Sequence, residues 1–298
     1  MKAMASLVMR GRTQAVMLAT LFSVLSLILP PLSYFSGAII ALVTLRKSAQ
    51  EGFIIFLLAG VAVALMSNFT LGNSLIALVY AGAVWIPVWL LAQILRSTVS
   101  LSTTLLFAGG FGLIVVLGFH VILGSPIEWW QGMLDKMFMQ AAEQSQELDT
   151  ASLETMGAMA AQVMTGIIAA TFVLSLVGSL LLGRWWQAVL YNPGGFQGEF
   201  HELTLNKVLA GLTVVATVGS IFAGVGSLSA DLAAVVITLA SIYGLALIHD
   251  WIKSTEVNAM WLTATYLLLV VFTFQVMAAL AFLACINAWF DMRKNFKK

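Results

Sequence analysis

Charged residues are scarce in this sequence. They make up 9% of the 298 residues, whereas a soluble globular domain carries about 25%. Apolar residues make up 61%, and the mean hydropathy is +1.00. Nearly every stretch long enough to form a helix is apolar on all sides, as lipid-embedded helices are. The scarcity of charge therefore excludes a soluble domain and predicts an integral membrane protein.

The residue patterns of common catalytic and metal sites are also missing. The sequence has no phosphate-binding loop, zinc-protease motif, nucleophile elbow or Cys-x-x-Cys pair. Its single cysteine, Cys285, can form neither an intramolecular disulfide nor a thiolate metal cage, and we interpret it as a small core side chain. The net charge is only +1 and the sequence has no basic patch that could neutralise phosphates, which excludes nucleic acid as a partner. We therefore expect no catalytic residue, no metal and no cofactor, so the protein is not predicted to be an enzyme.

What the sequence does contain is a series of apolar runs along its whole length. They cover roughly 14–29, 33–45, 53–66, 74–95, 102–123, 161–182, 208–228, 231–248, 259–273 and 276–290. None alternates polar and apolar residues as a membrane-barrel strand does. The predicted fold is all-α, a polytopic transmembrane helix bundle that forms a single integral membrane domain over residues 1–298. We interpret the basic, apolar N-terminus as an uncleaved first span.

The number of crossings depends on two segments. Pro30 and Pro31 must break the first pair of runs, because proline lacks the amide donor. Residues 259–290 form either one very long helix or two short ones that turn near Thr273. Charge bias favours a turn in each of these two segments, since ten crossings from a cytoplasmic N-terminus leave 13 of the 14 basic residues inside. These are Lys2, Arg10, Arg12, Arg46, Lys47, Arg96, Arg184, Lys207, Lys253, Arg293, Lys294, Lys297 and Lys298. We predict eight to ten crossings, both termini in the cytoplasm, and a bacterial cytoplasmic (inner) membrane.

Two segments outside the spans are distinctive. Residues 124–160 carry six acidic residues and one lysine, and their apolar residues recur at helical spacing. We predict an extracytoplasmic amphipathic helix that lies in the headgroup region or covers the bundle as a lid. Residues 184–206 form the predicted cytoplasmic elbow, an interfacial segment in which Asn192 and Pro193 end a helix.

The elbow also supplies candidate docking residues. We expect Trp185, Trp186 and Tyr191 at headgroup depth. Phe196, Phe200 and Leu203 can then face the membrane, while Glu199, His201 and Glu202 face water. A cytoplasmic partner would meet Trp185, Trp186, Glu199, His201 and Glu202.

Small residues repeat on the first span, at Ala15, Ala19 and Ser23. This stripe suits either dense packing within the bundle or docking of a partner helix.

Candidate ligand-binding residues are few. The central portions of the spans contain no Lys, Arg, Asp or Glu, which argues against a proton-coupled antiporter or an ion pump. His120 and Gln275 are the most interesting polar residues within spans, and they serve either a ligand cavity or contacts between helices. Trp129 and Trp130 begin the apolar face of the lid segment, which serves packing or ligand gating.

The sequence resembles a known family in three places. These are "CINAWFDMRKNFKK" at the C-terminus, "IYGLALIHDWIKS" upstream of it, and the Trp-Gln, Pro-Gly-Gly-Phe and Glu-Phe-x-x-Leu elements of the elbow. They are similar to the YybS-like family of bacterial polytopic membrane proteins, whose function is unknown. Members often carry an acidic residue where this chain has Asn287. The family is distantly similar to the substrate-capture (S) subunits of energy-coupling-factor transporters, which implies an outward ligand cavity and a docking surface on the first helix.

Two functions follow from these patterns. The first is a transport-type subunit that binds a small neutral or zwitterionic solute and depends on a separate ATPase, because the chain has no nucleotide-binding motif. The second is a non-transporting scaffold or assembly factor of an envelope complex. Both imply the lipid bilayer and other membrane protein subunits as partners.

Overall fold

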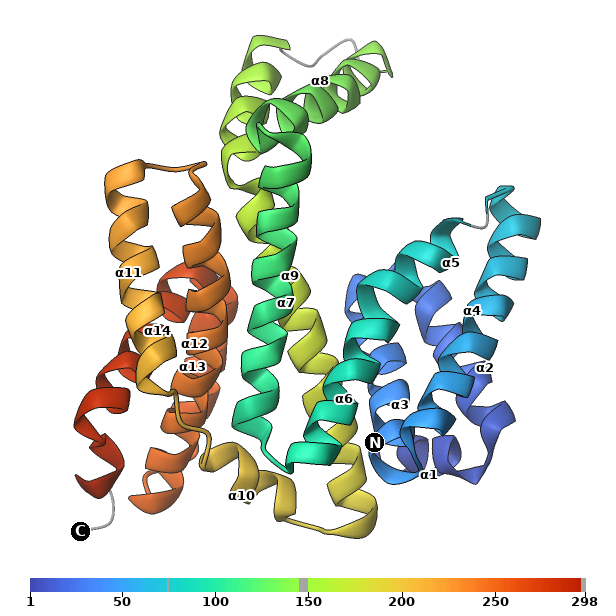
Figure 1. Ribbon diagram of the computed structural model, residues 1–298, viewed down its shortest axis with the longest axis vertical. Helices are drawn as coiled ribbons and strands as arrows, with labels where there is room; N and C mark the ends of the chain where they lie inside the picture. Colours follow the sequence, from blue (N-terminus) through green and yellow to red (C-terminus); the bar gives the residue numbers. More distant parts are fainter. Residues whose placement is uncertain (74, 145–149, 296–298) are drawn as a thin grey trace. The chain divides into compact units, whose positions relative to one another are not determined.

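The computed structural model describes residues 1–73, 75–144 and 150–295, which contain helices and no strand (Figure 1). The α-helices are α1 (Lys2–Arg10), α2 (Arg12–Leu25), α3 (Ser33–Arg46), α4 (Ala49–Leu71), α5 (Leu75–Tyr80), α6 (Ile86–Thr98), α7 (Leu101–Leu123), α8 (Pro126–Gln144), α9 (Thr150–Tyr191), α10 (Gly195–His201), α11 (Lys207–Ala223), α12 (Leu228–Ser254), α13 (Met260–Val271) and α14 (Thr273–Phe290). Short 3₁₀ or π segments are η1 (Pro30–Leu32), η2 (Ala81–Trp85) and η3 (Met292–Asn295).

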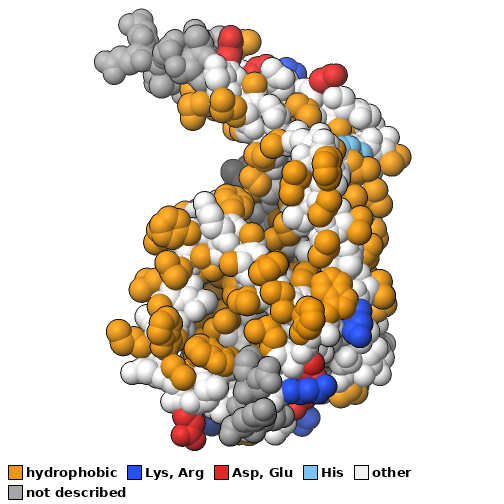
Figure 2. All heavy atoms as spheres, turned by 90° about the vertical axis from the view of Figure 1, so that its left-hand side faces the viewer, with side chains coloured by type: hydrophobic (Ala, Val, Ile, Leu, Met, Phe, Trp, Pro, Cys, Tyr) orange, Lys and Arg blue, Asp and Glu red, His pale blue; other side chains and the backbone are white. Residues whose placement is uncertain are grey.

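Six helical segments among the described residues are long and apolar enough to cross a membrane. They are Ala49–Phe69, Leu78–Thr98, Leu101–Leu123, Leu153–Tyr191, Leu228–Ser254 and Thr273–Phe290. Three shorter apolar helices are α2, α11 and α13. On the side where α11 and α14 lie, hydrophobic side chains cover the middle and charged side chains lie toward the ends (Figure 2). The chain is therefore a polytopic membrane helix bundle in contact with the lipid bilayer.

Both uncertain segments contain a turn. The Pro30–Pro31 pair lies in η1, between α2 and α3, so the expected break is confirmed. Residues 259–290 form two helices that meet at Phe272, whose φ of −122° and ψ of 51° interrupt the helix. Beyond α14, Arg293 Nε lies 3.1 Å from Asp250 Oδ2 near the end of α12. The ends of α12 and α14 therefore lie on the same side, as the charge bias predicted.

The chain divides into two compact units, and helices α7 and α9 each have one part in either unit. Unit 1 comprises residues 1–108 and 174–203, and unit 2 comprises residues 109–173 and 204–298. In unit 1, the Trp85 indole is fully buried, and its Nε1 donates to Ser36 Oγ at 2.9 Å. Ser36 Oγ in turn donates to the carbonyl of Ala19 at 2.8 Å, which ties α2, α3 and η2 together.

Unit 2 is built around α12. A Cβ atom on Gly244 would overlap the carbonyl oxygen of Leu280, so only glycine allows α12 and α14 to approach this closely. The basic residues Lys207, Lys253 and Arg293 lie at the end of unit 2 where α12 finishes. The opposite end carries α8, with Glu128 and Asp135. This separation of charge within unit 2 is the one that the positive-inside rule predicts.

Helix α8 crosses the ends of α7 and α9 that belong to unit 2 (Figure 1). Its apolar residues form two stripes rather than one. Trp130, Leu134 and Phe138 are buried or half-buried, and a Cβ on Gly157 of α9 would lie 3.1 Å from Phe138. Trp129, Met133 and Met137 are exposed. The helix thus packs on the bundle and still presents an apolar surface; residues 145–149 of the predicted 124–160 segment lie outside the described residues.

Candidate functional site

A buried, hydrogen-bonded histidine–aspartate pair joins α7 to α12. His120 Nε2 lies 2.8 Å from Asp231 Oδ2, and their side chains are only 19% and 6% exposed. Asp231 lies in the first turn of α12, where the helix dipole favours a negative charge. Ser227 is the N-cap of this helix, because its Oγ accepts a hydrogen bond from the backbone amide of Ala230 at 3.2 Å. Local sequence thus places a carboxylate at a helix start, and packing places a histidine against it.

A glycine on α9 makes room for this carboxylate. A Cβ atom on Gly166 would lie 3.0 Å from Asp231 Oδ1 and 3.2 Å from Ala234 Cβ. Such contacts are tighter than most Cβ atoms make. Gly166 therefore lets α9 lie directly against the first turns of α12, with Oδ1 of Asp231 facing it.

The same layer holds α8 in place. Trp130 is buried, and its Nε1 donates to Thr165 Oγ1 at 2.9 Å. Its ring stacks on Phe119 at 5.5 Å between centroids. Since Thr165 precedes Gly166 and Phe119 precedes His120, the anchor of α8 lies one residue from both partners of Asp231.

A cavity of about 320 Å³ lies beside Asp231, entirely within unit 2. We call it the Asp231 cavity. It is lined by Gln162, Val163, Gly166, Ile167, Val225, Gly226, Ala230, Asp231, Ala234 and Phe274. Asp231 is the only ionisable residue in this lining, and the only aromatic ring comes from Phe274. Val225 and Phe274 are exposed, while Asp231 is buried, so the cavity leads from the protein surface to a buried carboxylate.

The predicted ligand-binding residues lie near this cavity but do not line it. His120 binds Asp231, and Trp130 fixes α8 to Thr165. Trp129 packs edge-on against Trp130 at 4.6 Å between centroids and is partly exposed. Gln275 is exposed, and its neighbour Phe274 lines the cavity instead.

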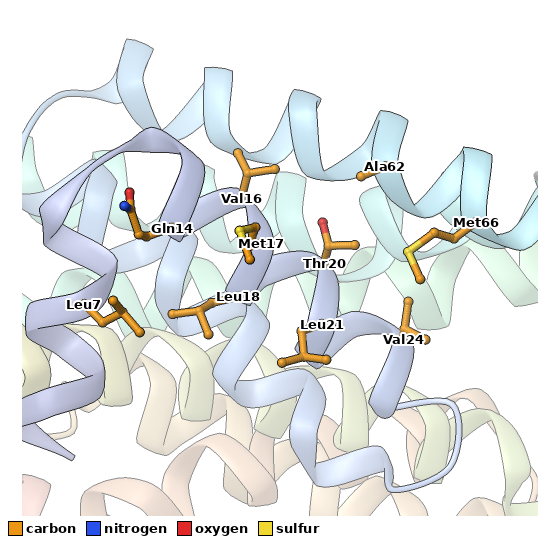
Figure 3. A pocket seen from close by; sticks show the side chains of 10 residues that line it. All are labelled: Leu7, Gln14, Val16, Met17, Leu18, Thr20, Leu21, Val24, Ala62 and Met66. Atoms are coloured by element: carbon orange, nitrogen blue, oxygen red, sulfur yellow. The ribbon is translucent and has the colours of Figure 1, made fainter.

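Unit 1 contains a second hollow, which we call the unit 1 groove. It has a volume of about 500 Å³ and lies among α1, α2 and α4 (Figure 3). Its lining residues are Leu7, Gln14, Val16, Met17, Leu18, Thr20, Leu21, Val24, Ala62 and Met66. None of them is ionisable, and only Gln14 and Thr20 are polar.

The small-residue stripe of α2 packs inside unit 1. Ala15, Ala19 and Ser23 are each no more than 2% exposed, and Ala19 accepts the hydrogen bond from Ser36. Of the two uses that the sequence left open, the structure shows close packing within the bundle for these residues.

Helix α9 ends at Tyr191, directly before Asn192 and Pro193, which were expected to end it, and Gly194 adopts a left-handed φ of 87°. Arg184 donates to Glu199 through two nitrogens, with Nε 2.8 Å from Oε2. Trp185 is half-buried and Glu202 is exposed.

Two expectations for the elbow are wrong. Trp186 is 0% exposed and belongs to the core of unit 1, so it cannot contact headgroups. His201 is 7% exposed and does not face water, because it ends α10 on the side that packs onto the protein together with Leu203. Helical spacing alone did not show which face of this short helix is covered.

Sequence reasoning missed Asp231 as a functional candidate. It lies 111 positions from His120 and at the start of an apolar run. An acidic residue at that position ordinarily indicates a helix end exposed to solvent. Its signal was weak but present, since it is an acidic residue within a segment long enough to span the membrane. Among the described residues, no group of three or more His, Cys, Asp or Glu side chains is placed to hold a metal ion.

Comparison with known proteins adds no relative. The chain matches no family model, no curated protein and no solved structure.

Proposed function

We propose that the protein binds a small solute in the Asp231 cavity, as the capture subunit of a transport system in a bacterial cytoplasmic membrane. The observation that carries this proposal is the buried His120–Asp231 pair beside a cavity of about 320 Å³. Ionisable residues within membrane segments are costly and are usually kept for function. A mainly apolar pocket with a few polar groups is also the usual form of a small-molecule site.

The chain is expected to act with other subunits. It has no phosphate-binding loop, so energy from ATP would come from a separate protein. The resemblance of its C-terminal and elbow motifs to the YybS-like family, and through it to S subunits, supports the same arrangement. Helix α8, fixed beside the cavity by Trp130, would form part of the cover over the bound solute.

Thermal unfolding of the purified protein with a metabolite panel tests this function. A ligand at 100 times its dissociation constant stabilises the folded state by about 2.7 kcal/mol. We expect at least one panel member to raise the unfolding temperature. We expect Gly166→Val to abolish this effect, because its side chain would enter the space beside Asp231.

Gly118→Val is the matched control, since a Cβ atom at Gly118 meets no atom within 4 Å. A panel without any stabilising compound, or stabilisation that survives in Gly166→Val, would argue against the proposed site.

A scaffold function is favoured by one different observation. A hollow of about 500 Å³ lies at the elbow, lined by Lys2, Trp185, Ala188, Val189, Pro193, Gly194, Phe196 and Gln197. Under this alternative, the hollow receives a cytoplasmic partner. Co-purification from native membranes should then give a stoichiometric partner that Val189→Trp removes.

A further inference from the structure

We propose that the solute carries a protonated amine or quaternary ammonium group on a small apolar body, and that Asp231 binds this group. The inference rests on the proposed function and names the chemistry of its ligand.

The charge of the lining is the first argument. Asp231 is the only ionisable residue that lines the cavity, and no lysine, arginine or histidine does so. Its Oδ2 is engaged by His120, and its Oδ1 lies against Gly166, itself a lining residue. A carboxylate in an apolar pocket attracts a cation strongly, because little water screens the interaction. The same carboxylate disfavours an anionic solute, since no lysine, arginine or histidine lines the cavity.

The remaining lining defines the rest of the ligand. Apart from Asp231 and Gln162, the cavity is lined by Gly, Ala, Val, Ile and Phe residues. These residues favour an apolar body, and the ring of Phe274 offers an aromatic face of the kind that attracts ammonium groups. The volume of about 320 Å³ is at the lower end of the range for small-molecule sites. The fit is therefore to a small amine rather than to a large or multiply charged one.

The mouth of the cavity explains how such a molecule would enter. Val163, Ile167 and Phe274 are exposed, and all three belong to helical segments long and apolar enough to span the membrane. Apolar side chains on that surface face lipid, so the cavity opens toward the bilayer. A lipophilic amine concentrates near the membrane boundary, with its charge at the headgroups and its body in the acyl layer. Asp231 is the fourth residue of α12 and lies near one end of the apolar segment Leu228–Ser254.

Matched probes of different charge test the ligand class. The probes are 2-phenylethylamine, its neutral isostere 2-phenylethanol and the anion 3-phenylpropionate, together with a second series built on a quaternary ammonium and its neutral carbon analogue. Binding to the purified native protein is measured by calorimetry and by thermal shift. We expect the cation of each series to bind at least tenfold more tightly than its neutral partner, and the anion most weakly.

Variants assign the preference to Asp231. In Asp231→Asn, the dissociation constants of the cationic and neutral probes should differ by less than threefold. Binding of the neutral probe should persist. Asp231→Glu keeps the charge and should retain the preference. Asp250→Asn is the matched control, because Asp250 is an ion-paired acid at the other end of the same helix.

The outcomes separate the ligand class from the proposed function. If neutral or anionic probes bind as tightly as cations to the native protein, the ammonium inference is overturned and the solute site stands. If neither the probes nor the metabolite panel bind, the proposed function fails as well. The comparison on the native protein decides the ligand class even if Asp231→Asn does not fold.

Discussion

The unit 1 groove and the Asp231 cavity are both hollows in an apolar bundle, yet they differ in chemistry. The groove is the larger, about 500 Å³ against about 320 Å³. Its lining has no ionisable side chain, and Met17 and Leu21 on its wall are exposed. The cavity contains a carboxylate that is nearly inaccessible to solvent and is held by a histidine.

This difference shows that volume alone does not indicate a solute site in a membrane protein. An apolar groove on a membrane helix needs only lipid to fill it, because acyl chains satisfy apolar side chains. A buried carboxylate, in contrast, requires a partner, since the removal of a charge from water is costly. The smaller hollow is therefore the one whose chemistry calls for a function.

The largest expected effect comes from removal of the histidine. His120→Ala leaves Asp231 buried without its partner, and we expect a loss of about 3 kcal/mol in the free energy of unfolding. Denaturant titration in detergent micelles measures this loss. The double variant His120→Leu/Asp231→Leu should recover most of it, because an apolar pair can replace a buried hydrogen-bonded pair with little loss.

Thr20→Val in the unit 1 groove is the control for this experiment, and it should change stability by less than about 0.5 kcal/mol. The contrast between the two hollows disappears if His120→Ala and Thr20→Val have equal effects.

An intermediate effect is expected at the anchor of α8. Trp130→Phe removes the hydrogen bond to Thr165 and should lower stability by about 1 kcal/mol. Because this bond links α8 to α9, the rate of amide hydrogen exchange in α8 should increase when it is lost. Trp129→Phe, at an exposed neighbouring position, should change neither quantity appreciably. Equal exchange in the two variants would show that packing alone holds α8.

The smallest effect on stability is expected from filling the groove, and a matched pair of alanines makes this test sharp. Ala62 lines the groove and Ala234 lines the cavity. Ala62→Leu should alter stability by no more than about 0.5 kcal/mol and leave binding of the amine probes unchanged. Ala234→Leu should reduce that binding at least tenfold. A loss of binding in Ala62→Leu alone would place the solute in unit 1.

Much of the fold could be predicted from the sequence, because helix breaks depend on local chemistry. The Pro30–Pro31 turn follows from a missing amide donor, and Gly194 permits the reversal that follows α9. The turn within 259–290 followed from charge bias rather than from any breaker residue, since Phe272 itself gives no such signal.

The site could be predicted only in part, because it depends on which faces of the helices meet. A helix that is apolar all round gives no indication of its buried side, so His120 was found and its partner Asp231 was not. The same limit explains the elbow, where Trp185 is half-buried and the adjacent Trp186 is fully buried. Gly166 could not be singled out among 24 glycines, since its importance lies in what α12 places against it.

The interruption at Phe272 starts a new helix, α14, within an apolar part of the chain. Helix α14 begins there without a side-chain cap, so the first amides of its opening turn have no acceptor within the helix. Such groups persist at membrane depth only where they are enclosed by protein or reached by water. One of them belongs to Phe274, a residue of the Asp231 cavity wall. The amide of Phe274 therefore needs an acceptor from outside its own helix, at the wall of the Asp231 cavity.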